Sequence, residues 1–553
     1  MKRWKRFLAL TMALCLSAAL LAGCGGGNDK NQQPGNQQPS SSGTDNNNAP
    51  AAPTNVSEED KYGGTLTIAL ASVASNIDPI MYTGVYEGQI IENICDTLIV
   101  YDNEQMDFWP SLATEWTANE AGDEWTITLR DDVYFQPGKY QDGRKMTAED
   151  VKFSLERSHN ESALARLTML DHCEVIDDTH IVCVLESPNS SFLAALTNSG
   201  NVIVPREEVE GWGEEFGAHL VGTGPFMMAE DGWKTDQGVY MTRFDNYWGQ
   251  KPYLDGLNIV YITEVNQRVN ALKTGEIDIA FDISGEGVQQ IRDDPNLNMV
   301  QNPGMGVNYI YFNMVNGPTA DIRVRKALQM AVDREAMCKA LYQYDEGQPG
   351  WLALPPNSWG YDESLIDLVP KYDVEGAKAL LAEAGYPDGF TLEYYTGDSA
   401  TSKKIGEIFQ QFAQAIGVTV KINQAAWGTF SEIGASGNAD VIAMSWTWYP
   451  DPYFYLNKMF HEESLGTLGN GQQFNIPEVN DLLDQAVAES DQAARAVLYK
   501  EALKLITEQY AQIDYAVSNV NVGMSNKVMD FPVRPDKTIE VADDKNNNTW
   551  IAK

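Results

Sequence analysis

The longest apolar run of this 553-residue chain lies at its N-terminus, so the remaining sequence must build its interior from short, separated apolar segments. Residues 2–6 carry four basic side chains, and residues 7–21 are almost entirely apolar. Such a run is too short to span a hydrocarbon core about 30 Å thick, which takes about 20 helical residues. A basic start followed by a short apolar stretch is typical of a secretory signal peptide. We therefore expect the folded body to lie outside the cytoplasm.

Residues 21–24 read Leu-Ala-Gly-Cys and end the apolar stretch. They resemble a bacterial lipobox, in which a signal peptidase cuts before the cysteine and the cysteine sulfur carries a diacylglycerol. The resemblance implies a lipoprotein signal peptide over residues 1–23 and lipidation of Cys24, which would anchor the protein to the cell membrane. An ordinary secretory signal or a short signal anchor is the alternative.

Residues 24–60 form a polar segment rich in Gly, Asn, Gln, Pro and Ser. Because few of its side chains could bury apolar surface, we predict a disordered tether. A flexible coil of this length has an r.m.s. reach of about 30–35 Å. The folded body would then be held near a membrane and remain free to tumble.

The net charge of the chain limits the kinds of molecule that it can bind. It carries 78 acidic and 39 basic residues, which gives a formal net charge of −39. A strongly acidic protein is repelled by polyanions, and this argues against a nucleic-acid partner. About 490 residues follow the tether, a length typical of two or three domains.

Four cysteines remain for the folded body: Cys95, Cys173, Cys183 and Cys338. Cys173 and Cys183 flank a predicted turn at residues 177–178, and a hairpin there would place them face to face. An extracytoplasmic compartment permits a disulfide between them, and a pair of buried thiols is the alternative.

Strand and helix signals alternate along the body. Residues 63–70 and 125–130 read as strands, the second with period-two alternation. Residues 147–155 begin with a capping-box pattern and read as a helix, and residues 372–385 read as a helix that Asp373 caps. This alternation favours an α/β fold with partly parallel sheets.

The sequence lacks the motifs of common catalytic and metal sites. It contains no Gly-x-Ser-x-Gly and no Gly-x-x-x-x-Gly-Lys-Ser/Thr, the patterns of serine hydrolases and nucleotide-binding loops. No two of its five histidines have metal-ligand spacing on one helix. We therefore expect a protein without enzymatic activity, cofactor or metal centre.

Nine short phrases follow one another in an informative order. They are Gly-Gly-Thr-Leu-Thr at 63–67 with Ile-Asp-Pro at 77–79, Pro-Ser-Leu-Ala-Thr-Glu-Trp at 110–116, Thr-Ile-Thr-Leu-Arg at 126–130 with Val-Tyr-Phe at 133–135, Asp-Gly at 142–143 with Met-Thr-Ala-Glu-Asp-Val at 146–151, Gly-Thr-Gly-Pro-Phe at 222–226, Asn-Tyr-Trp-Gly-Gln-Lys-Pro-Tyr-Leu at 246–254, Phe-Asn at 312–313 with Asp-Ile-Arg-Val-Arg-Lys-Ala-Leu at 321–328, Ala-Lys-Ala-Leu-Leu-Ala-Glu-Ala-Gly at 377–385, and Tyr-Pro-Asp-Pro at 449–452. Together they resemble the bacterial extracellular solute-binding proteins of family 5, which serve peptide- and nickel-type ABC importers.

The resemblance implies an α/β fold of the periplasmic-binding-protein type. Two lobes would form a clamshell, with a hinge between mixed sheets flanked by helices and with lobe one enlarged by an extra subdomain. On this template lobe one covers residues 61–305 plus 516–553, and lobe two covers residues 306–515. The Asn-Pro-Gly sequence at 302–304 agrees, since it would interrupt regular structure at the first crossing.

The resemblance also implies a function. A lipid-anchored, monomeric substrate-binding component of an ABC importer would capture a small ligand, an oligopeptide by preference, and deliver it to a membrane permease. Three alternatives stay open. The same fold could bind an oligosaccharide or a metal chelate, the protein could be a ligand receptor for signalling, or it could be a surface hydrolase, which the missing motifs disfavour.

The ligand would contact apolar walls and a few directional polar groups between the lobes. In the family, a tryptophan and an aromatic loop about twenty residues downstream face this cleft, and polar residues after the first strand border it. The matching positions of this chain are Trp427, then Trp446, Trp448 and Tyr449, and then Ser72, Ser75 and Asn76. The alternative is that the aromatic residues belong to the interior of lobe two and the polar ones to an ordinary loop.

One departure from the family pattern concerns the ligand's charge. Peptide-binding members commonly read Trp-x-x-Asp-Tyr, and that aspartate pairs with the peptide α-ammonium. Here Trp446 is followed by Thr, Trp and Tyr, so the aspartate is missing, and we expect Asp451 to form a turn. A buried, unpaired ammonium is costly. Either another carboxylate supplies the charge, or the ligand is not a free-amine peptide.

Basic residues follow the central strand in the sequence Asp321-Ile-Arg323-Val-Arg325. We expect Asp321 to cap a helix, and Arg323 and Arg325 to be exposed or to lie between the lobes.

Overall fold

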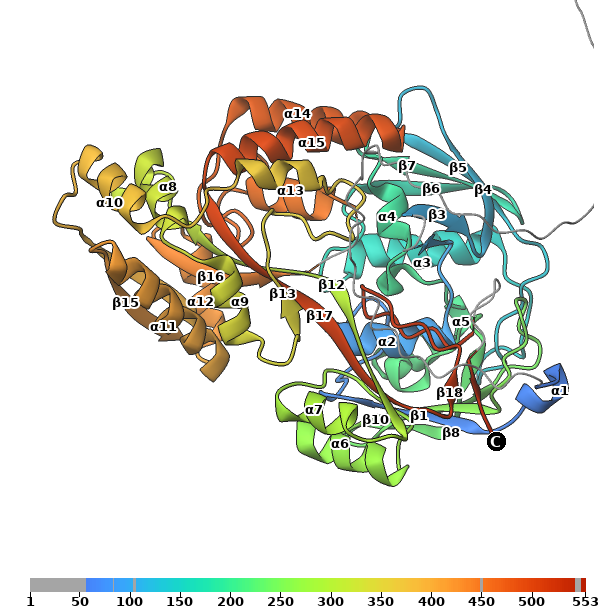
Figure 1. Cartoon of the computed structure of the whole chain (residues 1–553). Helices are drawn as coiled ribbons and strands as arrows, with labels where there is room; N and C mark the ends of the chain where they lie inside the picture. Colours follow the sequence, from blue (N-terminus) through green and yellow to red (C-terminus); the bar gives the residue numbers. More distant parts are fainter. Residues whose placement is uncertain (1–55, 83, 103–105, 448–450, 543–548) are drawn as a thin grey trace, which may run out of the picture. The chain divides into compact units, whose positions relative to one another are not determined.

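The computed structural model describes residues 56–82, 84–102, 106–447, 451–542 and 549–553, all within one compact unit that spans residues 48–553 (Figure 1). The expected signal peptide, Cys24, most of the tether, Trp448 and Tyr449 lie outside the described residues. Within the described ranges, no helix is both long and apolar enough to cross a membrane.

The strands of the described residues are β1 (Thr65–Leu70), β2 (Ile99–Asp102), β3 (Asp107–Pro110), β4 (Ala113–Ala118), β5 (Glu124–Leu129), β6 (Leu170–Asp177), β7 (His180–Leu185), β8 (Phe226–Lys234), β9 (Gly238–Arg243), β10 (Gly256–Tyr261), β11 (Ile279–Ala280), β12 (Leu297–Phe312), β13 (Gly347–Gln348), β14 (Thr391–Gly397), β15 (Thr419–Ala425), β16 (Val441–Trp446), β17 (Gln512–Ser525), β18 (Val528–Met529) and β19 (Trp550–Ile551).

The α-helices are α1 (Glu58–Lys61), α2 (Val85–Ile94), α3 (Ala148–Glu161), α4 (Phe192–Leu196), α5 (Arg206–Trp212), α6 (Val265–Thr274), α7 (Glu286–Arg292), α8 (Ile322–Met330), α9 (Arg334–Leu341), α10 (Val374–Glu383), α11 (Ala400–Ala415), α12 (Trp427–Ala435), α13 (Tyr453–Phe460), α14 (Pro477–Ala488) and α15 (Gln492–Glu508). Short 3-10 turns occur at Ser199–Asn201, Gly213–His219, Pro318–Ala320, Glu363–Leu368 and Glu462–Ser464.

The largest sheet follows the order β15-β14-β16-β12-β17-β11-β1-β10-β9-β8, and β13 pairs with β17 beside this path. β1 is parallel to β10 and β11, and β14 is parallel to β15 and β16. The other neighbours in this sheet are antiparallel. The expected α/β fold with mixed sheets is therefore confirmed.

The long strands β12 and β17 connect the two ends of this sheet (Figure 1). They pair antiparallel. β12 continues through residues 302–304, where the sequence predicts an interruption of regular structure, and only the pairing register shifts there, between Pro303 and Gly306. On one flank β12 borders β16, and on the other β17 borders β11. Both predicted lobe crossings lie on this strand pair. The division into lobes at residues 305 and 515 stays a prediction.

Around β1 and β10, apolar side chains from sheet and helices form one interior. Leu66, Ile68 and Leu70 alternate toward it from β1, and Leu257 and Ile259 from β10. The apolar face of α2 packs on the same core, because its isoleucines recur at helical spacing (Ile90, Ile91 and Ile94). This packing fixes the position of α2 against the sheet.

A separate four-stranded sheet, with the order β4-β5-β7-β6, packs against α3. The predicted capping box is present at the start of α3, between Thr147 and Asp150. In the β6–β7 hairpin Cys173 lies directly opposite Cys183, as expected. This sheet matches the extra subdomain that the resemblance implies.

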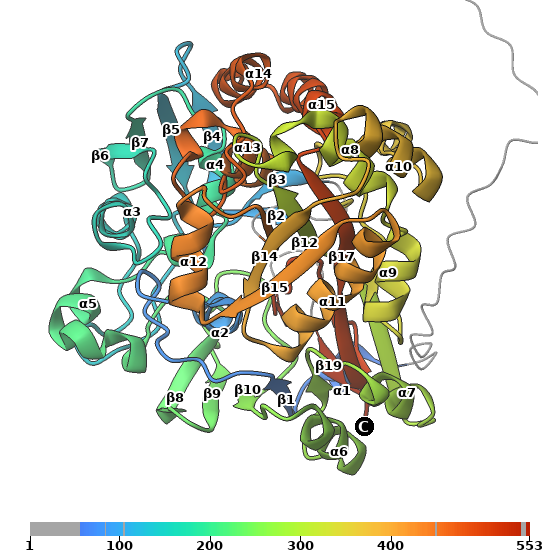
Figure 2. The same cartoon turned by 90° about the vertical axis from the view of Figure 1, so that its left-hand side faces the viewer.

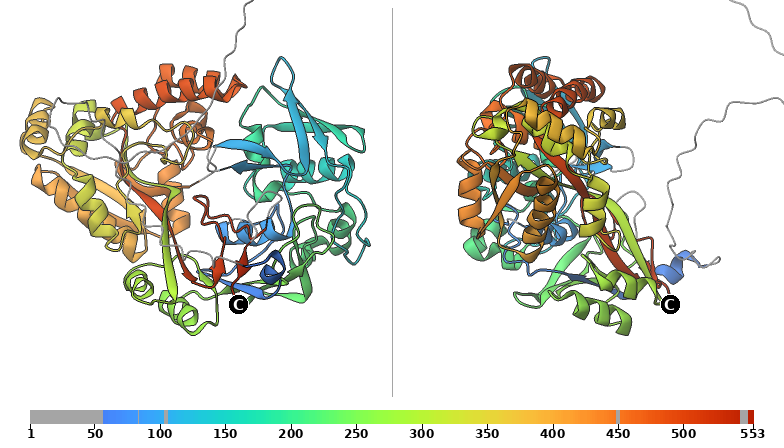
Figure 3. Two further views of the ribbon diagram at one scale, coloured as in Figure 1. Left: turned by 45° about the vertical axis from the view of Figure 1, so that its right-hand side comes forward. Right: turned by 60° about the vertical axis from the view of Figure 1, so that its left-hand side comes forward.

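Helices α11 and α12 pack against the strands from β14 to β16. Figure 2 shows α11 and α12 beside β14 and β15, and these elements are in contact. The end of α14 reaches the loop before α4, where the amide and hydroxyl of Ser190 both donate to the carbonyl of Val487 over 2.9 Å (Figure 3). These bonds thus link α14 to the segment that follows the four-stranded sheet.

Local capping chemistry explains several helix starts. Asp321 and Asp373 accept backbone hydrogen bonds at the starts of α8 and α10, as predicted. Ser57 likewise caps the single turn of α1, which occupies the last residues of the segment predicted to be disordered.

The expectation for Arg325 is wrong. Arg323 is exposed and pairs with Asp321, but Arg325 is buried, and its guanidinium donates to the carbonyls of Gln509 and Thr319. A buried guanidinium is tolerated here because main-chain oxygens satisfy its donors.

Candidate functional site

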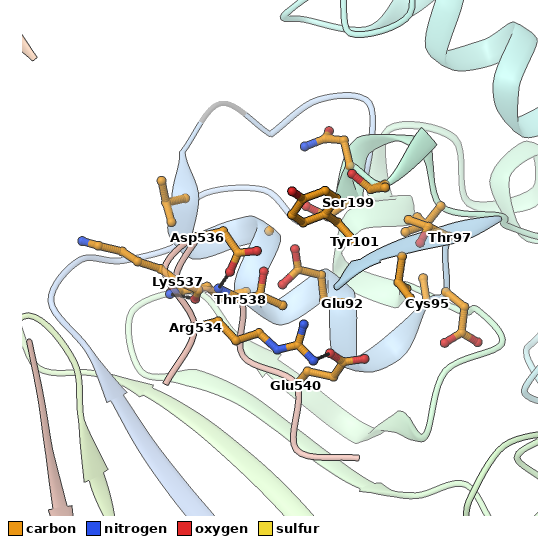
Figure 4. A pocket seen from close by; sticks show the side chains of 18 of the residues that line it. Glu92, Cys95, Thr97, Tyr101, Ser199, Arg534, Asp536, Lys537, Thr538 and Glu540 are labelled. Atoms are coloured by element: carbon orange, nitrogen blue, oxygen red, sulfur yellow. Dashed lines mark hydrogen bonds and ion pairs between the residues drawn. The ribbon is translucent and has the colours of Figure 1, made fainter. Parts of the chain in front are cut away.

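A pocket of about 310 Å³ lies between α2, β2 and the C-terminal segment 534–540 (Figure 4). The 3-10 turn after α4 and the aromatic pair at 247–248 also line it. Among its described lining residues, only Thr447, directly after β16, comes from residues 306–515. The pocket therefore combines elements from both ends of the chain with one position beside the predicted aromatic loop.

The polar face of α2 forms one wall of this pocket. Gln89 and Glu92 line the pocket, while the isoleucines of the same helix pack into the core. Gln89 is almost wholly buried, and Oε2 of Glu92 is shielded from solvent. An amphipathic helix thus presents polar groups to a concave site from a rigid support.

Side chains of α2 hold the C-terminal segment in place. Nε2 of Gln89 donates to the carbonyl of Lys537 over 2.7 Å, and Nδ2 of Asn93 donates to the carbonyl of Ile539 over 2.6 Å. Figure 4 shows Glu92 facing this segment. Residues more than 440 positions apart in the sequence are therefore joined directly.

Acidic side chains surround Glu92. Burial raises the pKa of the Glu92 carboxyl well above its ordinary value, and the charges of Asp536 and Glu540 raise it further. A hydrogen bond from Ser199 and the charge of Arg534 act in the opposite direction. Burial and the two acidic neighbours therefore shift the equilibrium of Glu92 toward its protonated form.

Other charged groups of the pocket have protein partners. Arg534 pairs with Glu540 over 2.5 Å, and Lys537 pairs with Asp282 over 2.7 Å. The carboxylate of Asp96 accepts hydrogen bonds from the Thr223 hydroxyl and the Trp248 indole. The guanidinium of Arg166 lies 4.0 Å from the ring centre of Tyr82 and donates to that residue's carbonyl. These contacts give the pocket fixed polar walls.

Aromatic rings supply its apolar surface. Tyr82, Tyr101, Tyr247 and Trp248 all line the pocket. The hydroxyl of Tyr101 is buried and has no hydrogen-bond partner among the described residues, and burial raises its pKa. Aromatic walls with a few placed polar groups are typical of small-molecule sites.

None of the described residues predicted to bind ligand lines this pocket. Ser72 is exposed, and Ser75 donates to the Glu87 carboxylate through its amide and hydroxyl. Asn76 caps the turn before Asp78 and lines a second, larger groove of about 970 Å³. Their roles as ligand contacts stay predictions.

The predicted aromatic residues occupy different environments. Trp427 begins α12 and is 66% exposed, so it does not belong to the interior. Trp446 is partly buried against the core beside α13, and its indole donates to the carbonyl of Phe454 over 2.9 Å. The two side chains thus differ in exposure, and their contact with ligand stays a prediction.

Asp451 forms a turn, as expected. Its Oδ1 accepts the amide of Tyr453 at the start of α13, and both carboxylate oxygens contact the guanidinium of Arg495. Asp451 is fully buried. It is therefore committed to the protein interior and does not replace the missing aspartate.

The sequence analysis did not predict the pocket residues on α2 and in segment 534–540. One sequence pattern could have indicated them: Gln89, Glu92 and Asn93 are polar residues among the isoleucines of a largely buried helix. Their partners in segment 534–540 lie too far away in the sequence for any local pattern to connect them.

Cys173 and Cys183 are present as buried thiols, with their sulfur atoms 3.7 Å apart. Contact with Cys183, together with burial, raises the pKa of Cys173. Oxidation of the pair stays a prediction. The described residues contain no group of three or more His, Cys, Asp or Glu side chains arranged to hold a metal ion.

Comparison with known proteins identifies the class. Residues 107–466 match the bacterial extracellular solute-binding proteins, family 5, and because this span exceeds half of the chain, the protein belongs to that family. It is therefore a solute-binding protein of the class that serves ABC importers.

Two curated relatives show how far the similarity extends. The dipeptide-binding protein of Escherichia coli is 27% identical over 453 residues, which cover 77% of this chain and 84% of that protein. Heme-binding protein A of Haemophilus influenzae is 28% identical over 471 residues, which cover 80% and 85% of the two chains. The relatives are binding proteins with different ligands.

Solved structures confirm the two-lobe clamshell fold. HbpA2 from Haemophilus parasuis superposes with a TM-score of 0.81 at 25% identity, covering 89% of this chain and all of that one. The periplasmic binding protein DppA from Helicobacter pylori, in complex with the peptide STSA, gives a TM-score of 0.73 at 27% identity, covering 90% and 99%. The periplasmic location of DppA agrees with an extracytoplasmic body for this chain.

Proposed function

We propose that this protein is the lipid-anchored substrate-binding component of an ABC importer, and that its ligand is a short peptide. The observation that carries the proposal is the pocket between α2, β2 and segment 534–540, which combines aromatic walls with buried polar groups in a member of this family. The protein captures its ligand, delivers it to a membrane permease and catalyses no reaction.

The preference for a peptide rests on the polarity of the pocket. Its walls offer both acceptor oxygens, as on Gln89 and Glu92, and donors, as on Tyr101. A peptide supplies donors and acceptors along its backbone as well as two charged ends, so it can satisfy such walls. Relatives named for dipeptides, di- and tripeptides, and glutathione support this ligand class.

Capture involves closure of lobe two, residues 306–515, on lobe one. The Thr447 position supports this view, because it brings the end of β16 to a pocket otherwise built from the other lobe. Closure removes the ligand from water and strengthens its polar contacts. The mature protein is a monomer held outside the cell membrane by a lipid on Cys24.

The test is to isolate the natively folded protein without its signal peptide and to identify co-purified molecules by mass spectrometry. Calorimetric titration with a panel of di- to tetrapeptides then measures affinity. Peptides in the extract and micromolar or tighter binding in the panel are expected. Recovery of a sugar, a metal chelate or a porphyrin together with no binding across the panel would overturn the peptide assignment.

A further inference from the structure

Three buried acceptor oxygens on α2 have no hydrogen-bond partner among the described residues, and two of them belong to side chains that line the pocket. These two are Oε2 of Glu92 and Oε1 of Gln89. Gln89 is only 2% exposed, and its amide orientation is fixed because Nε2 donates to the carbonyl of Lys537. Residues three apart are neighbours on a helix surface, so the two oxygens belong to one small region. Buried acceptors are normally paired, and these two therefore point to a donor from a bound molecule.

Glu92 has a hydrogen bond from Ser199, but its Oε2 has no partner among the described residues, and in this it differs from the other carboxyl groups that line the pocket. Asp96 accepts from Thr223 and Trp248, Glu540 pairs with Arg534, and Asp536 accepts the amide of Thr538. The lining cations are engaged as well, Lys537 with Asp282 and Arg166 with Tyr82 and Ser162.

The environment of Glu92 favours a positive charge. Asp536 and Glu540 lie close enough to act on it electrostatically, and Arg534 is the cation that opposes them. A positively charged group placed beside Glu92 would reduce the repulsion among these carboxylates. An ammonium carries three N–H donors and no acceptor, which suits a region with an excess of acceptor oxygens.

The aromatic loop does not supply a carboxylate that could pair with an ammonium of the ligand. The aspartate expected before Tyr449 is missing, and Asp451 is occupied by Arg495. A peptide bound with its ammonium in a closed pocket requires a counter-ion from elsewhere, since an unpaired buried charge is costly.

We propose that Glu92 is the counter-ion of the ligand's ammonium group and that Gln89 accepts a second hydrogen bond from it. This inference rests on the proposed function and narrows it to free-amine ligands. Binding converts the neutral Glu92 carboxylic acid into a carboxylate. The released proton passes to solvent, and the ammonium takes its place as the donor to Glu92.

The first test needs only the unaltered mature protein. The tightest binder of the di- to tetrapeptide panel is compared with its N-acetylated form, which lacks the ammonium. Acetylation is expected to weaken binding at least 30-fold. Titrations at pH 7 in phosphate and in Tris, which differ in protonation enthalpy, are expected to show release of up to about one proton per ligand, because Glu92 ionises on binding. Equal affinity for the two forms would overturn the inference and leave the peptide function intact.

The second test uses Glu92→Gln, which keeps the shape and removes the charge. It is expected to weaken binding of the free-amine peptide at least 30-fold, to bring the affinity ratio of free to acetylated peptide close to one, and to abolish proton release. Glu375→Gln, an exposed change on α10 with the same loss of charge, is the control and should change none of these values. If the Glu92→Gln protein folds and still prefers the free-amine peptide over the acetylated one by the same ratio, another carboxylate binds the ammonium. If no peptide of the panel binds the unaltered protein, both the peptide assignment and the role of Glu92 as counter-ion are wrong.

Discussion

The carboxylate of Asp451 and the guanidinium of Arg495 form an ion pair of 3.0 Å that is closed off from solvent, with side chains 0% and 3% exposed. The pair joins the start of α13 to α15. Arg495 also donates to the carbonyl of Ala486 at the end of α14 and lies 5.0 Å from the ring centre of Trp359. One buried cation thus holds three helices around the segment that follows the aromatic loop.

Removing Arg495 should strongly destabilise the protein. Arg495→Met leaves Asp451 buried without its counter-ion, and loss of one partner of a buried pair typically costs about 3–5 kcal/mol. Urea unfolding of the mature protein measures the change. Arg323→Met, which breaks the exposed pair with Asp321, is the matched control and should cost no more than about 1 kcal/mol. Similar losses in the two variants would mean that the buried pair has no special weight.

A second buried carboxyl predicts a pH dependence of stability. Burial raises the pKa of Asp514 from 3.8 to about 7, although hydrogen bonding from Gln512 and the charge of Arg334 oppose the shift. Between these two values the folded protein binds more protons than the unfolded chain, so this group makes stability fall as pH rises from about 4 to about 7.

Asp514→Asn removes that titration. At pH 8 the variant should be more stable than the unaltered protein, by up to about 4 kcal/mol, while at pH 4 the two should be similar. Unfolding free energies measured in urea across this range test the expectation. The prediction fails if the difference between the two proteins is the same at pH 4 and at pH 8.

The parts of the fold that the sequence predicted correctly depend on local chemistry. The side chains of Asp321 and Asp373 cap the helices that begin right after them, and the turn at 178–179, one position beyond the predicted one, sets Cys173 against Cys183. Each of these interactions joins residues within about one turn or one hairpin, so a short window of sequence contains both partners.

The parts that could not be predicted depend on distant partners. The sequence analysis expected Arg325 to be exposed or to lie between the lobes, but its guanidinium donates to the carbonyl of Gln509, which lies 184 positions away. The pocket was missed for the same reason, because Gln89 and Lys537 are separated by 448 positions. The family resemblance pointed to the fold and to an aromatic loop, whereas the pocket requires the contact between α2 and segment 534–540, which no local pattern predicts.

The lipid anchor leads to a prediction about location. If Cys24 carries a diacylglycerol, the mature protein should fractionate with membranes and resist washing with salt, because acyl chains rather than charges hold it. Cys24→Ser should release the body into the extracytoplasmic fraction. Membrane retention of the variant after salt washing would contradict the lipoprotein assignment.

The Cys173–Cys183 pair leads to a prediction about redox state. The two residues face each other on neighbouring strands, where Cα atoms lie about 4.5–5.5 Å apart, a separation that a disulfide can bridge. We expect protein exported from the cell to carry this bond and protein made in a reducing cytoplasm to carry two thiols. Non-reducing digestion with mass mapping distinguishes them, and Cys338, alone on α9, serves as the unpaired reference within the described residues. Two free thiols in the exported protein would mean that Cys173 and Cys183 only pack in the interior and form no disulfide.

Trp427 provides the most direct test of the predicted aromatic wall. Its indole is 66% exposed at the start of α12 and contacts Phe430, with ring centres 5.9 Å apart. If lobe closure buries this indole against ligand, Trp427→Ala should weaken peptide binding by about 2 kcal/mol, about thirtyfold. The melting temperature of the ligand-free protein should hardly change, because an exposed ring supports little of the core.

Ligand should also quench or shift tryptophan fluorescence in the unaltered protein, and less so in the Trp427→Ala variant. Val497→Ala, an exposed apolar truncation on α15, is the control and should alter neither affinity nor fluorescence. A Trp427→Ala protein with unchanged affinity and a clearly lower melting temperature would show that this side chain supports α12 and that the ligand lies elsewhere.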